Sequence, residues 1–430
     1  MSRILRQRTV SNQPGDGKDM KPFLEMKGLL EELFPSVHRA FHRETVAGAS
    51  LLFTLEGSDP APGPVMLTAH LDVVPAEEGE GWPHPPFSGA VDGGRIWGRG
   101  AIDYKLGVAA MLEACEELLD EGTVPRRTII LAMGHDEELG GDLGAAGITE
   151  LLRSRGVRLS SVLDEGGYIY SYPWLEGDVA VVGLAEKGYL TLRLTAVGEQ
   201  GHASVPGMVT AGGRLCRALS ALEENQMEPR LCAPVRMMLE GTAGMLRDRG
   251  RCAGGPEEMA RILEEFPQGN ALIRTTAAIT MMRGSSKENI IPGNPWALVN
   301  FRAVPGDGCR DILEHVRHVV GDMGVSVDYE DTRHIHEPSS ISSADTAEYR
   351  AISESVKAVW PGTPVVPGIF PAATDSRHYC GIAEQVYRFE PVHLGSRGLS
   401  ALHSRGESVS IGDLHGAVRF YGEYIRRVCV

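Results

Sequence analysis

A histidine and two aspartates in the first quarter of the chain have the types and spacing that metal binding requires. His70 lies two residues before Asp72 in T-A-H-L-D-V-V-P, and Asp103 follows in the glycine-rich stretch G-R-G-A-I-D-Y-K. Imidazole nitrogens and carboxylate oxygens are common ligands of divalent cations. An isolated His-x-Asp pair is more often an ordinary polar pair at a strand end, so the metal hypothesis needs further ligands.

Acidic residues also follow the next two apolar runs. The run that ends at Met133 leads into G-H-D-E-E-L-G-G, with Glu137 and Glu138, and a later short run leads into D-E-G-G, with Asp164 and Glu165. In an open parallel α/β sheet, ligands bind at the carboxyl ends of the strands. Three apolar runs that each end in carboxylate or imidazole groups therefore predict a metal site at this edge.

The adjacent glutamates predict the chemistry of that site. One carboxylate can bind a metal ion while its neighbour accepts a proton from a metal-bound water, whose pKa the metal lowers toward ~7. An isolated Glu-Glu pair is usually a solvated acidic turn, but that interpretation leaves His70, Asp72 and Asp103 unexplained. The pattern therefore indicates hydrolysis.

The order of the predicted elements places these groups at one sheet edge. Strands are predicted at residues 50–55, 65–74, 128–133 and 161–163, and helices at 20–34, 106–119 and 143–153. Strands that alternate with helices form a parallel sheet with right-handed crossovers. Residues 1–20 are polar and are expected to be flexible, and residues 231–269 have no regular pattern.

The hydrophobic pattern changes near Glu186. Residues 189–197 and 296–304 alternate between apolar and polar side chains, as in strands that are covered on one face. We therefore expect an α/β fold with a mostly parallel sheet and an inserted α+β domain. The expected boundaries are 1–185 and 303–430 for the first domain and 186–302 for the insertion.

Composition excludes several partners and compartments. The net charge of −15 argues against nucleic acid or anionic membrane as a partner. The seven cysteines form no C-x-x-C pair and are expected to be free thiols. The N-terminal segment lacks the apolar core of a secretory signal, and no apolar run reaches the ~18 residues of a membrane span. These features predict a cytoplasmic protein.

From Leu67 onward the chain resembles the zinc-dependent aminoacylase and carboxypeptidase S family of co-catalytic dinuclear metallopeptidases, and most of all its carboxypeptidase S and N-fatty-acyl-amino-acid hydrolase branch. Further motifs carry this resemblance: W-x-x-x-P-F-S-G, E-K-G-Y-L-T-L, E-Q-G-H-A-S-V-P, E-N-I-I-P-G and T-D-S-R-H-Y. The resemblance implies a dinuclear zinc hydrolase domain with an inserted ferredoxin-like domain that serves as lid and dimerisation surface.

The resemblance also implies a set of metal ligands. Asp103 would bridge two zinc ions, with Co²⁺ or Mn²⁺ as possible replacements. The implied ligands are His70, Asp103, Glu138, His403 in A-L-H-S-R-G-E, and one acid of the D-E-G-G turn, either Asp164 or Glu165. Members of the family differ in that turn, and several place the ligand directly before the glycine, which favours Glu165.

Five other residues would act on the substrate or on a ligand. Glu137 is the implied general base, and Asp72 would orient His70. His202 would reach the active site of the partner subunit and stabilise the oxyanion. Asn289 would bind the substrate carbonyl, and Arg377 would pair with a free substrate carboxylate. The chain is accordingly expected to form a homodimer.

The function expected from these residues is hydrolysis of the amide next to a free C-terminal carboxylate, in a small peptide or an N-acyl amino acid. One alternative is an aminoacylase restricted to N-acyl amino acids. Another is a non-catalytic binding protein that retained the fold, which predicts a missing ligand, and none is missing. The chain departs from the usual motifs of the family at two places, and both concern substrate preference. A-A-T-D replaces the usual G-G-T-D, and Tyr104 follows Asp103 where an aspartate is frequent in the family.

Overall fold

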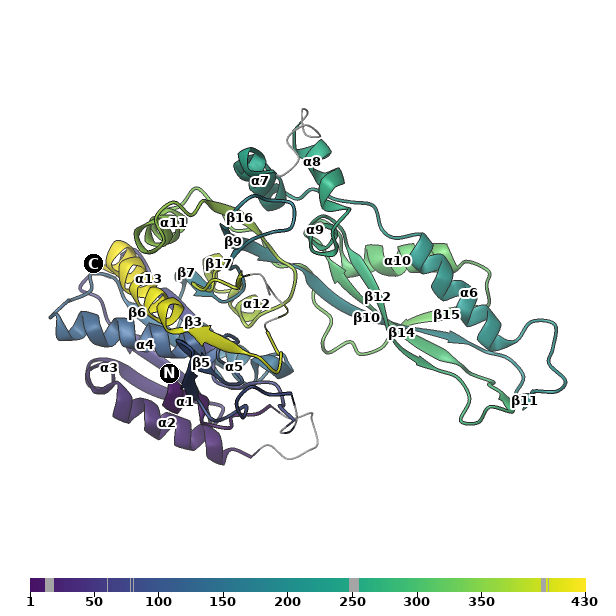
Figure 1. Cartoon of the computed structure of the whole chain (residues 1–430), viewed down its shortest axis with the longest axis horizontal. Coiled ribbons are helices and arrows are strands. Elements are labelled where there is room, and N and C mark those ends of the chain that lie inside the picture. Colours follow the sequence, from purple (N-terminus) through teal and green to yellow (C-terminus); the bar gives the residue numbers. More distant parts are fainter. Residues whose placement is uncertain are drawn as a thin grey trace.

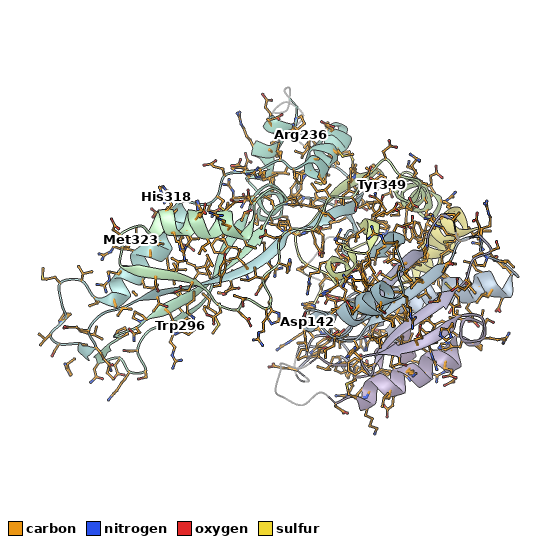
Figure 2. All side chains as sticks on the ribbon, turned by 180° about the vertical axis from the view of Figure 1, so that it is seen from behind. Asp142, Arg236, Trp296, His318, Met323 and Tyr349 are labelled. Carbon is orange, nitrogen blue, oxygen red and sulfur yellow. The ribbon has the colours of Figure 1, made fainter. Side chains whose placement is uncertain are left out.

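The computed structural model describes residues 1–11, 19–59, 61–77, 79, 81–246, 255–395, 400 and 402–430. The molecule has two lobes, and both chain ends lie on the same one (Figure 1). Seen from behind in Figure 2, Trp296, His318 and Met323 lie on the elongated second lobe and Tyr349 lies on the first.

The first lobe is built on a large sheet. Among the described residues it has nine strands in the order β1-β2-β6-β3-β7-β17-β9-β16, with β8 beside β9. Their bounds are His42–Val46 (β1), Ser50–Leu55 (β2), Val65–His70 (β3), Ile129–Gly134 (β6), Leu159–Asp164 (β7), Ile169–Tyr170 (β8), Val179–Glu186 (β9), Val365–Phe370 (β16) and Ala383–Arg388 (β17). The adjacent strands β6, β3, β7 and β17 are parallel, which confirms the predicted mostly parallel sheet.

Helices cover the sheet, and β3 and β6 are buried along their whole length, as parallel strands covered on both faces should be. The helices of this lobe are Ser2–Leu5 (α1), Lys21–Leu33 (α2), Pro35–Ala40 (α3), Lys105–Asp120 (α4), Ala145–Ser154 (α5), Ala347–Val359 (α11), Ser376–Tyr379 (α12) and Ile411–Cys429 (α13). A small sheet has the order β18-β5-β4, with bounds Ser408–Ser410 (β18), Arg95–Trp97 (β5) and Ala90–Asp92 (β4).

The second lobe contains a four-stranded antiparallel sheet with the order β12-β14-β10-β15. Its elements, in chain order, are Gly188–Ala196 (β10), Ala211–Glu224 (α6), Thr276–Arg283 (β12), Trp296–Ala303 (β14), Cys309–Val320 (α10) and Val325–Tyr329 (β15). This βαββαβ order is the ferredoxin-like arrangement, as expected. Alternate leucines of β10 are buried against α6 and α10, so one face of the sheet is covered.

The second lobe extends past the expected boundary at residue 302. Residues 325–329 pair with β10, so a division at 302 separates two strands of one sheet. The short run at 325–329 has no distinctive sequence pattern, so the expected boundaries place it in the first domain. We propose that the inserted segment continues to Tyr329.

Residues 231–269 have no regular sequence pattern, yet the described residues of 231–273 form three α-helices: Ala233–Thr242 (α7), Pro256–Leu263 (α8) and Pro267–Ile273 (α9). Side chains of α7, including Val235 and Met238, form an apolar cluster with Val181 and Val366 of the main sheet. Figure 1 shows these helices above the junction of the two lobes. The insertion therefore also covers part of the first lobe.

The expectation that residues 1–20 are flexible is wrong for residues 1–11. Ile4 and Leu5 are fully buried, and Val10 pairs with Val73 beyond the end of β3. Strand β3 itself ends at His70, short of the expected end at residue 74. Within the described ranges no helix is both long and apolar enough to cross a bilayer. Cys252 lies outside the described residues, and the described cysteines are free.

Candidate metal centre and active site

The predicted residues of the first lobe meet where strands β3, β6 and β7 end. His70 is the last residue of β3, and Glu165 directly follows β7. The turn after β6 contains a 3-10 helix, Glu137–Leu139 (η1), and Asp103 lies just before α4. The carboxyl ends of neighbouring strands thus meet at one edge, as the sequence predicted.

Asp103 lies between two histidines. Its Oδ1 is 2.9 Å from His70 Nε2, and its Oδ2 is 2.9 Å from His403 Nε2. Glu165 Oε1 lies 3.5 Å from the same His70 nitrogen, and Glu138 Oε1 lies 3.5 Å from the His403 nitrogen. The two oxygens of one carboxylate therefore face two separate groups of side chains.

These groups fit two divalent cations. One consists of His70, Asp103 and Glu165, and the other of Asp103, Glu138 and His403. In each group the candidate ligand atoms lie within 4.8 Å of one another. A donor set of carboxylates and imidazoles without thiolate suits Zn²⁺, Co²⁺ or Mn²⁺.

The two acids of the D-E-G-G turn have different surroundings. The Asp164 carboxylate accepts hydrogen bonds from the backbone N–H groups of Glu165 and Ser376, both at 2.8 Å. It therefore holds its own turn against the start of α12. The Glu165 carboxylate faces His70, so of the two acids Glu165 is the better placed to bind a metal ion.

Asp72 holds both His70 and the turn that carries the glutamates. His70 Nδ1 lies 3.0 Å from the Asp72 carbonyl oxygen and 3.5 Å from Asp72 Oδ1, which leaves Nε2 directed at Asp103. The Asp72 carboxylate also accepts hydrogen bonds from the backbone N–H groups of Glu137 and Glu138, each at 3.2 Å. The hydrogen bonds that Asp72 accepts from the turn with the two glutamates could not be predicted from the sequence.

Electrostatics at the site favour cation binding. Burial raises the pKa values of Glu137 and Glu165 well above the ordinary value of a glutamate. Hydrogen bonds with Asp103 and Glu138 raise the pKa of His403 to about 10. In the absence of cations, protons on these side chains offset the negative charge of the carboxylates. Bound divalent cations would offset the same charge.

His403 also has an unusual backbone. Its φ is +53°, in the left-handed region that non-glycine residues seldom occupy. Such conformations cluster at functional sites, where the surrounding contacts maintain them. Here the Arg99 side chain donates a 2.9 Å hydrogen bond to the His403 carbonyl.

A basic cavity of about 500 Å³ adjoins the glutamates. Glu137 and Glu138 form part of its wall, together with Arg302, Arg377, Tyr189, His334 and His336. The Arg377 guanidinium donates hydrogen bonds to the backbone carbonyls of Gly140 and Thr374. Arg302, from β14, lies over the Tyr189 ring, 4.7 Å from its centroid. Two guanidinium groups in one cavity suit an anionic substrate group.

His202 and Asn289 lie apart from this site in the same chain. His202 belongs to, and Asn289 directly precedes, a small two-stranded sheet of Gly201–His202 (β11) and Ile290–Ile291 (β13), whose first strand lies at the far end of the second lobe (Figure 1). His202 is exposed and hydrogen-bonds with Ser204, and the Ala203 N–H donates to the Asn289 carbonyl. The two residues are neighbours of each other and not of the metal ligands.

Comparison with known proteins identifies the family. The profile of peptidase family M20/M25/M40 matches residues 66–427. The chain belongs to this family. It is 39% identical to the N-fatty-acyl-amino acid synthase/hydrolase PM20D1 of Mus musculus over 92% of this chain and 81% of that protein. It is 30% identical to carboxypeptidase S of Saccharomyces cerevisiae over 96% of this chain and 80% of that protein.

Solved structures of the M20 family agree with the fold. The M20 metallo-carboxypeptidase Sso-CP2 of Sulfolobus solfataricus superposes with a TM-score of 0.70 at 18% identity and covers 99% of this chain and 97% of its own. Human carnosine dipeptidase 1 gives a TM-score of 0.67 at 17% identity, with 99% and 94% covered. Together with the relatives, the family identifies this M20 protein as a hydrolase of amide bonds.

The sequence did not predict one pair that holds the M20 ligands in place. Glu407 Oε1 accepts hydrogen bonds from the backbone N–H groups of Ile102 and Asp103, at 3.0 and 3.3 Å. Its Oε2 accepts a 2.5 Å hydrogen bond from Arg99. Arg99 and Glu407 are far apart in sequence, and no spacing rule links them. Arg302 was missed for the same reason.

Proposed function

We propose that this M20 hydrolase uses two zinc ions to cleave the amide next to the free carboxylate of a small peptide or an N-acyl amino acid. The observation that carries the proposal is the position of Asp103, whose two oxygens each lie 2.9 Å from a different histidine. His70, Asp103 and Glu165 would hold one ion, and Asp103, Glu138 and His403 the other. When bound, the ions would polarise the scissile carbonyl and lower the pKa of a water molecule.

Glu137 is the proposed general base. It belongs to neither ligand group, lies next to Glu138, and forms part of the wall of the basic cavity. Burial raises the pKa of its carboxylate well above the ordinary value of a glutamate, which makes the carboxylate a better proton acceptor. Glu137 would take a proton from the attacking water and deliver it to the leaving amine.

Arg302 and Arg377 are proposed to bind the free carboxylate of the substrate. Arg377 already donates to two backbone carbonyls, which fixes its guanidinium at the cavity wall. Among the described residues, the Arg302 guanidinium lies against the Tyr189 ring, so its N–H groups are the better available donors. This arrangement supports cleavage next to a carboxylate rather than within a long chain.

We further propose a homodimer in which His202 and Asn289 act on the partner's active site. The exposed position of His202 far from the metal ligands of its own chain supports this role. Val205 and Met208, next to it, are 82% and 102% exposed, which is unusual for apolar side chains that meet only water. His202 would donate to the oxyanion, and Asn289 would bind the substrate carbonyl.

An aminoacylase restricted to N-acyl amino acids is the alternative function. The cytoplasmic location of the protein stays a prediction. The test compares hydrolysis of N-acyl amino acids, dipeptides and the same compounds with an amidated C-terminus, together with the zinc content of the protein. We expect about two zinc ions per chain, loss of activity with a chelator, and no cleavage of amidated compounds. Full activity of a zinc-free protein, or equal cleavage of amidated compounds, would contradict the proposal.

A further inference from the structure

Two oppositely charged side chains are buried together behind the candidate metal centre. Glu186 is the last residue of β9, and Arg388 is the last residue of β17, the strand beside β9 (Figure 1). Arg388 Nε donates a 3.2 Å hydrogen bond to Glu186 Oε2, and both residues are fully buried. A buried ion pair is weak evidence for stability, because both charges must leave water to form it. The pair also has no part in the proposed reaction, so its contacts must indicate what it does.

The pair holds the loop that carries one of the proposed carboxylate-binding arginines. Glu186 Oε2 accepts hydrogen bonds from the Thr374 backbone N–H at 3.0 Å and from the Thr374 hydroxyl at 3.1 Å. The Thr374 carbonyl in turn accepts a 3.3 Å hydrogen bond from the Arg377 guanidinium. The place of Arg377 in the wall of the basic cavity therefore depends on Glu186.

The same pair supports the turn that carries a proposed metal ligand. Gly166 directly follows Glu165, and a Cβ at Gly166 would lie 3.2 Å from the Arg388 Cβ, so this turn packs closely on Arg388. The Asp164 carboxylate, from the same turn, accepts the 2.8 Å hydrogen bond of the Ser376 N–H. The turn with Glu165 and the loop before Arg377 thus form one compact unit around the ion pair. This unit fixes the distance between the metal centre and Arg377.

A fixed distance between these two points would select substrates by length. In an N-acyl-α-amino acid, one carbon separates the amide nitrogen from the carboxylate, whereas two carbons separate them in an N-acyl-β-amino acid. The second carbon lengthens this part of the substrate by up to ~1.5 Å, the length of one C–C bond. A misplacement of ~1 Å can lower the rate about 10²-fold. A β-amino acid bound at Arg377 would therefore hold its amide carbonyl out of place at the metal centre.

We infer that Glu186 and Arg388 are positioning residues that fix the span from Arg377 to the metal centre and so restrict cleavage to the amides of α-amino acids. The inference rests on the proposed function, because it requires the substrate carboxylate at Arg377 and the scissile carbonyl at the metal centre. The two residues act through Thr374 and Gly166, which they contact.

The first experiment measures kcat/KM for two pairs of compounds that differ by one methylene before the carboxylate. The pairs are N-octanoyl-phenylalanine with N-octanoyl-β-homophenylalanine, and the dipeptide Leu-Phe with Leu-β-homophenylalanine. The α compound of each pair that is cleaved should exceed its β partner by about 10²-fold or more. If neither α compound is cleaved, the proposed function fails, and the inference fails with it. If the α and β compounds are cleaved equally well, the proposed function stands and only the inference on the span fails.

A second experiment tests whether the ion pair sets this selectivity. Glu186→Gln removes the charge that holds Arg388 and Thr374, and Thr374→Val removes only the hydroxyl contact with Glu186. Thr242→Val is the matched control, because the Thr242 hydroxyl is also buried but donates to the Met238 carbonyl within α7. The α-to-β ratio of kcat/KM should fall about tenfold or more in Glu186→Gln and about threefold or more in Thr374→Val.

The control and the zinc content separate positioning from a general loss of structure. Thr242→Val should keep the α-to-β ratio within about twofold of the wild type, and all three variants should keep the zinc content of the wild type. A ratio that stays unchanged in folded Thr374→Val and Glu186→Gln proteins would overturn the inference, even if both rates fall. Thermal unfolding verifies folding, and if Glu186→Gln does not fold, the ratio in Thr374→Val decides alone.

Discussion

The Ser11 hydroxyl donates a 2.5 Å hydrogen bond to Asp72 Oδ2, so the N-terminal segment is part of the support of the metal centre. Both residues are buried. Asp72 also holds His70 and the η1 turn, and Ser11 is thus one contact removed from the proposed ligands. This relationship yields the first prediction.

Ser11→Ala should lower both the unfolding free energy, by about 1–3 kcal/mol, and kcat, because it removes one hydrogen bond of a buried carboxylate. Thr9→Val is the matched control, since the Thr9 hydroxyl is also buried but donates to the Leu71 carbonyl. Urea denaturation and steady-state kinetics measure the two effects. Equal losses of kcat in both variants would show that Ser11 contributes only to stability.

Glu137→Gln should reduce kcat by about 10²- to 10⁴-fold because it removes the proposed proton acceptor. The amide keeps the shape of the side chain and lies outside both ligand groups, so the zinc content should stay as in the wild type. Elemental analysis of zinc and steady-state kinetics on one preparation separate loss of the proton acceptor from loss of zinc. Near wild-type turnover with zinc bound would rule out Glu137 as the base.

Mixing two inactive variants tests the shared active site. A dimer of one His202→Ala chain and one Glu137→Gln chain would contain one complete site, because the intact Glu137 and the intact His202 would meet there. A 1:1 mixture that exchanges subunits should regain about a quarter of wild-type activity. Mixing Glu137→Gln with His70→Ala is the control: both variants lack a group that acts within its own chain. A mixture of the first pair that stays inactive after verified exchange would refute action across the interface.

Arg302→Met should raise KM for N-acyl amino acids by about tenfold or more, since one charge-assisted hydrogen bond contributes ~1.5–3 kcal/mol. It should have little effect on the inhibition constants of analogues whose carboxylate is amidated. Arg193→Met, at another cation–π contact on the second lobe, is the matched control. Equal effects of Arg302→Met on the free acids and on the amidated analogues would argue against binding of the carboxylate.

The stability of the protein should depend on pH through Lys187. Burial, with a smaller contribution from Arg302, lowers the pKa of Lys187 to about 7. Between this pH and the ordinary lysine pKa of ~10.4, the unfolded chain holds a proton that the folded chain lacks, so the contribution of Lys187 to stability rises with pH and is lost as pH falls toward 7.

The unfolding free energy of wild type minus that of Lys187→Met should therefore increase between about pH 7 and 10, by at most ~1.4 kcal/mol per pH unit. Lys357→Met, at an exposed position of α11, is the control and should give a flat difference. Urea denaturation at several pH values measures both. A flat difference for Lys187→Met would show that Lys187 stays charged in the folded protein.

Local sequence patterns predicted most of the candidate metal centre. His70, Glu138 and Glu165 follow consecutive apolar runs, and parallel strands necessarily bring such ends to one edge. Identifying His403 required the family resemblance, because a lone histidine in a loop carries no local signal. The choice between Asp164 and Glu165 depended on which carboxylate the backbone N–H groups occupy, a property of the folded turn.

Contacts between distant segments were the features that the sequence did not predict. Residues 1–11 look polar, yet Ile4 and Leu5 are buried because α1 packs against α2 and α4. Helices α7–α9 were missed because their apolar faces match a sheet in the other lobe. Glu407 and Arg302 likewise act on segments far from them in sequence. In each case the fold, and not the spacing of residues in the sequence, determines which segments come into contact.

The junction of the lobes has a mechanical consequence. Strand β9 ends at Glu186 and β10 begins at Gly188, and the returning chain pairs with it through two hydrogen bonds between Tyr189 and His336. A Cβ at Gly188 would lie 2.8 Å from the His336 carbonyl oxygen, so the two chain segments that connect the lobes here are closely packed. The two connections at this point therefore form one paired ribbon, and helices α7–α9 join the lobes a second time. Any closure over a substrate must bend that ribbon, and Tyr189 and His336, which line the basic cavity, lie on it.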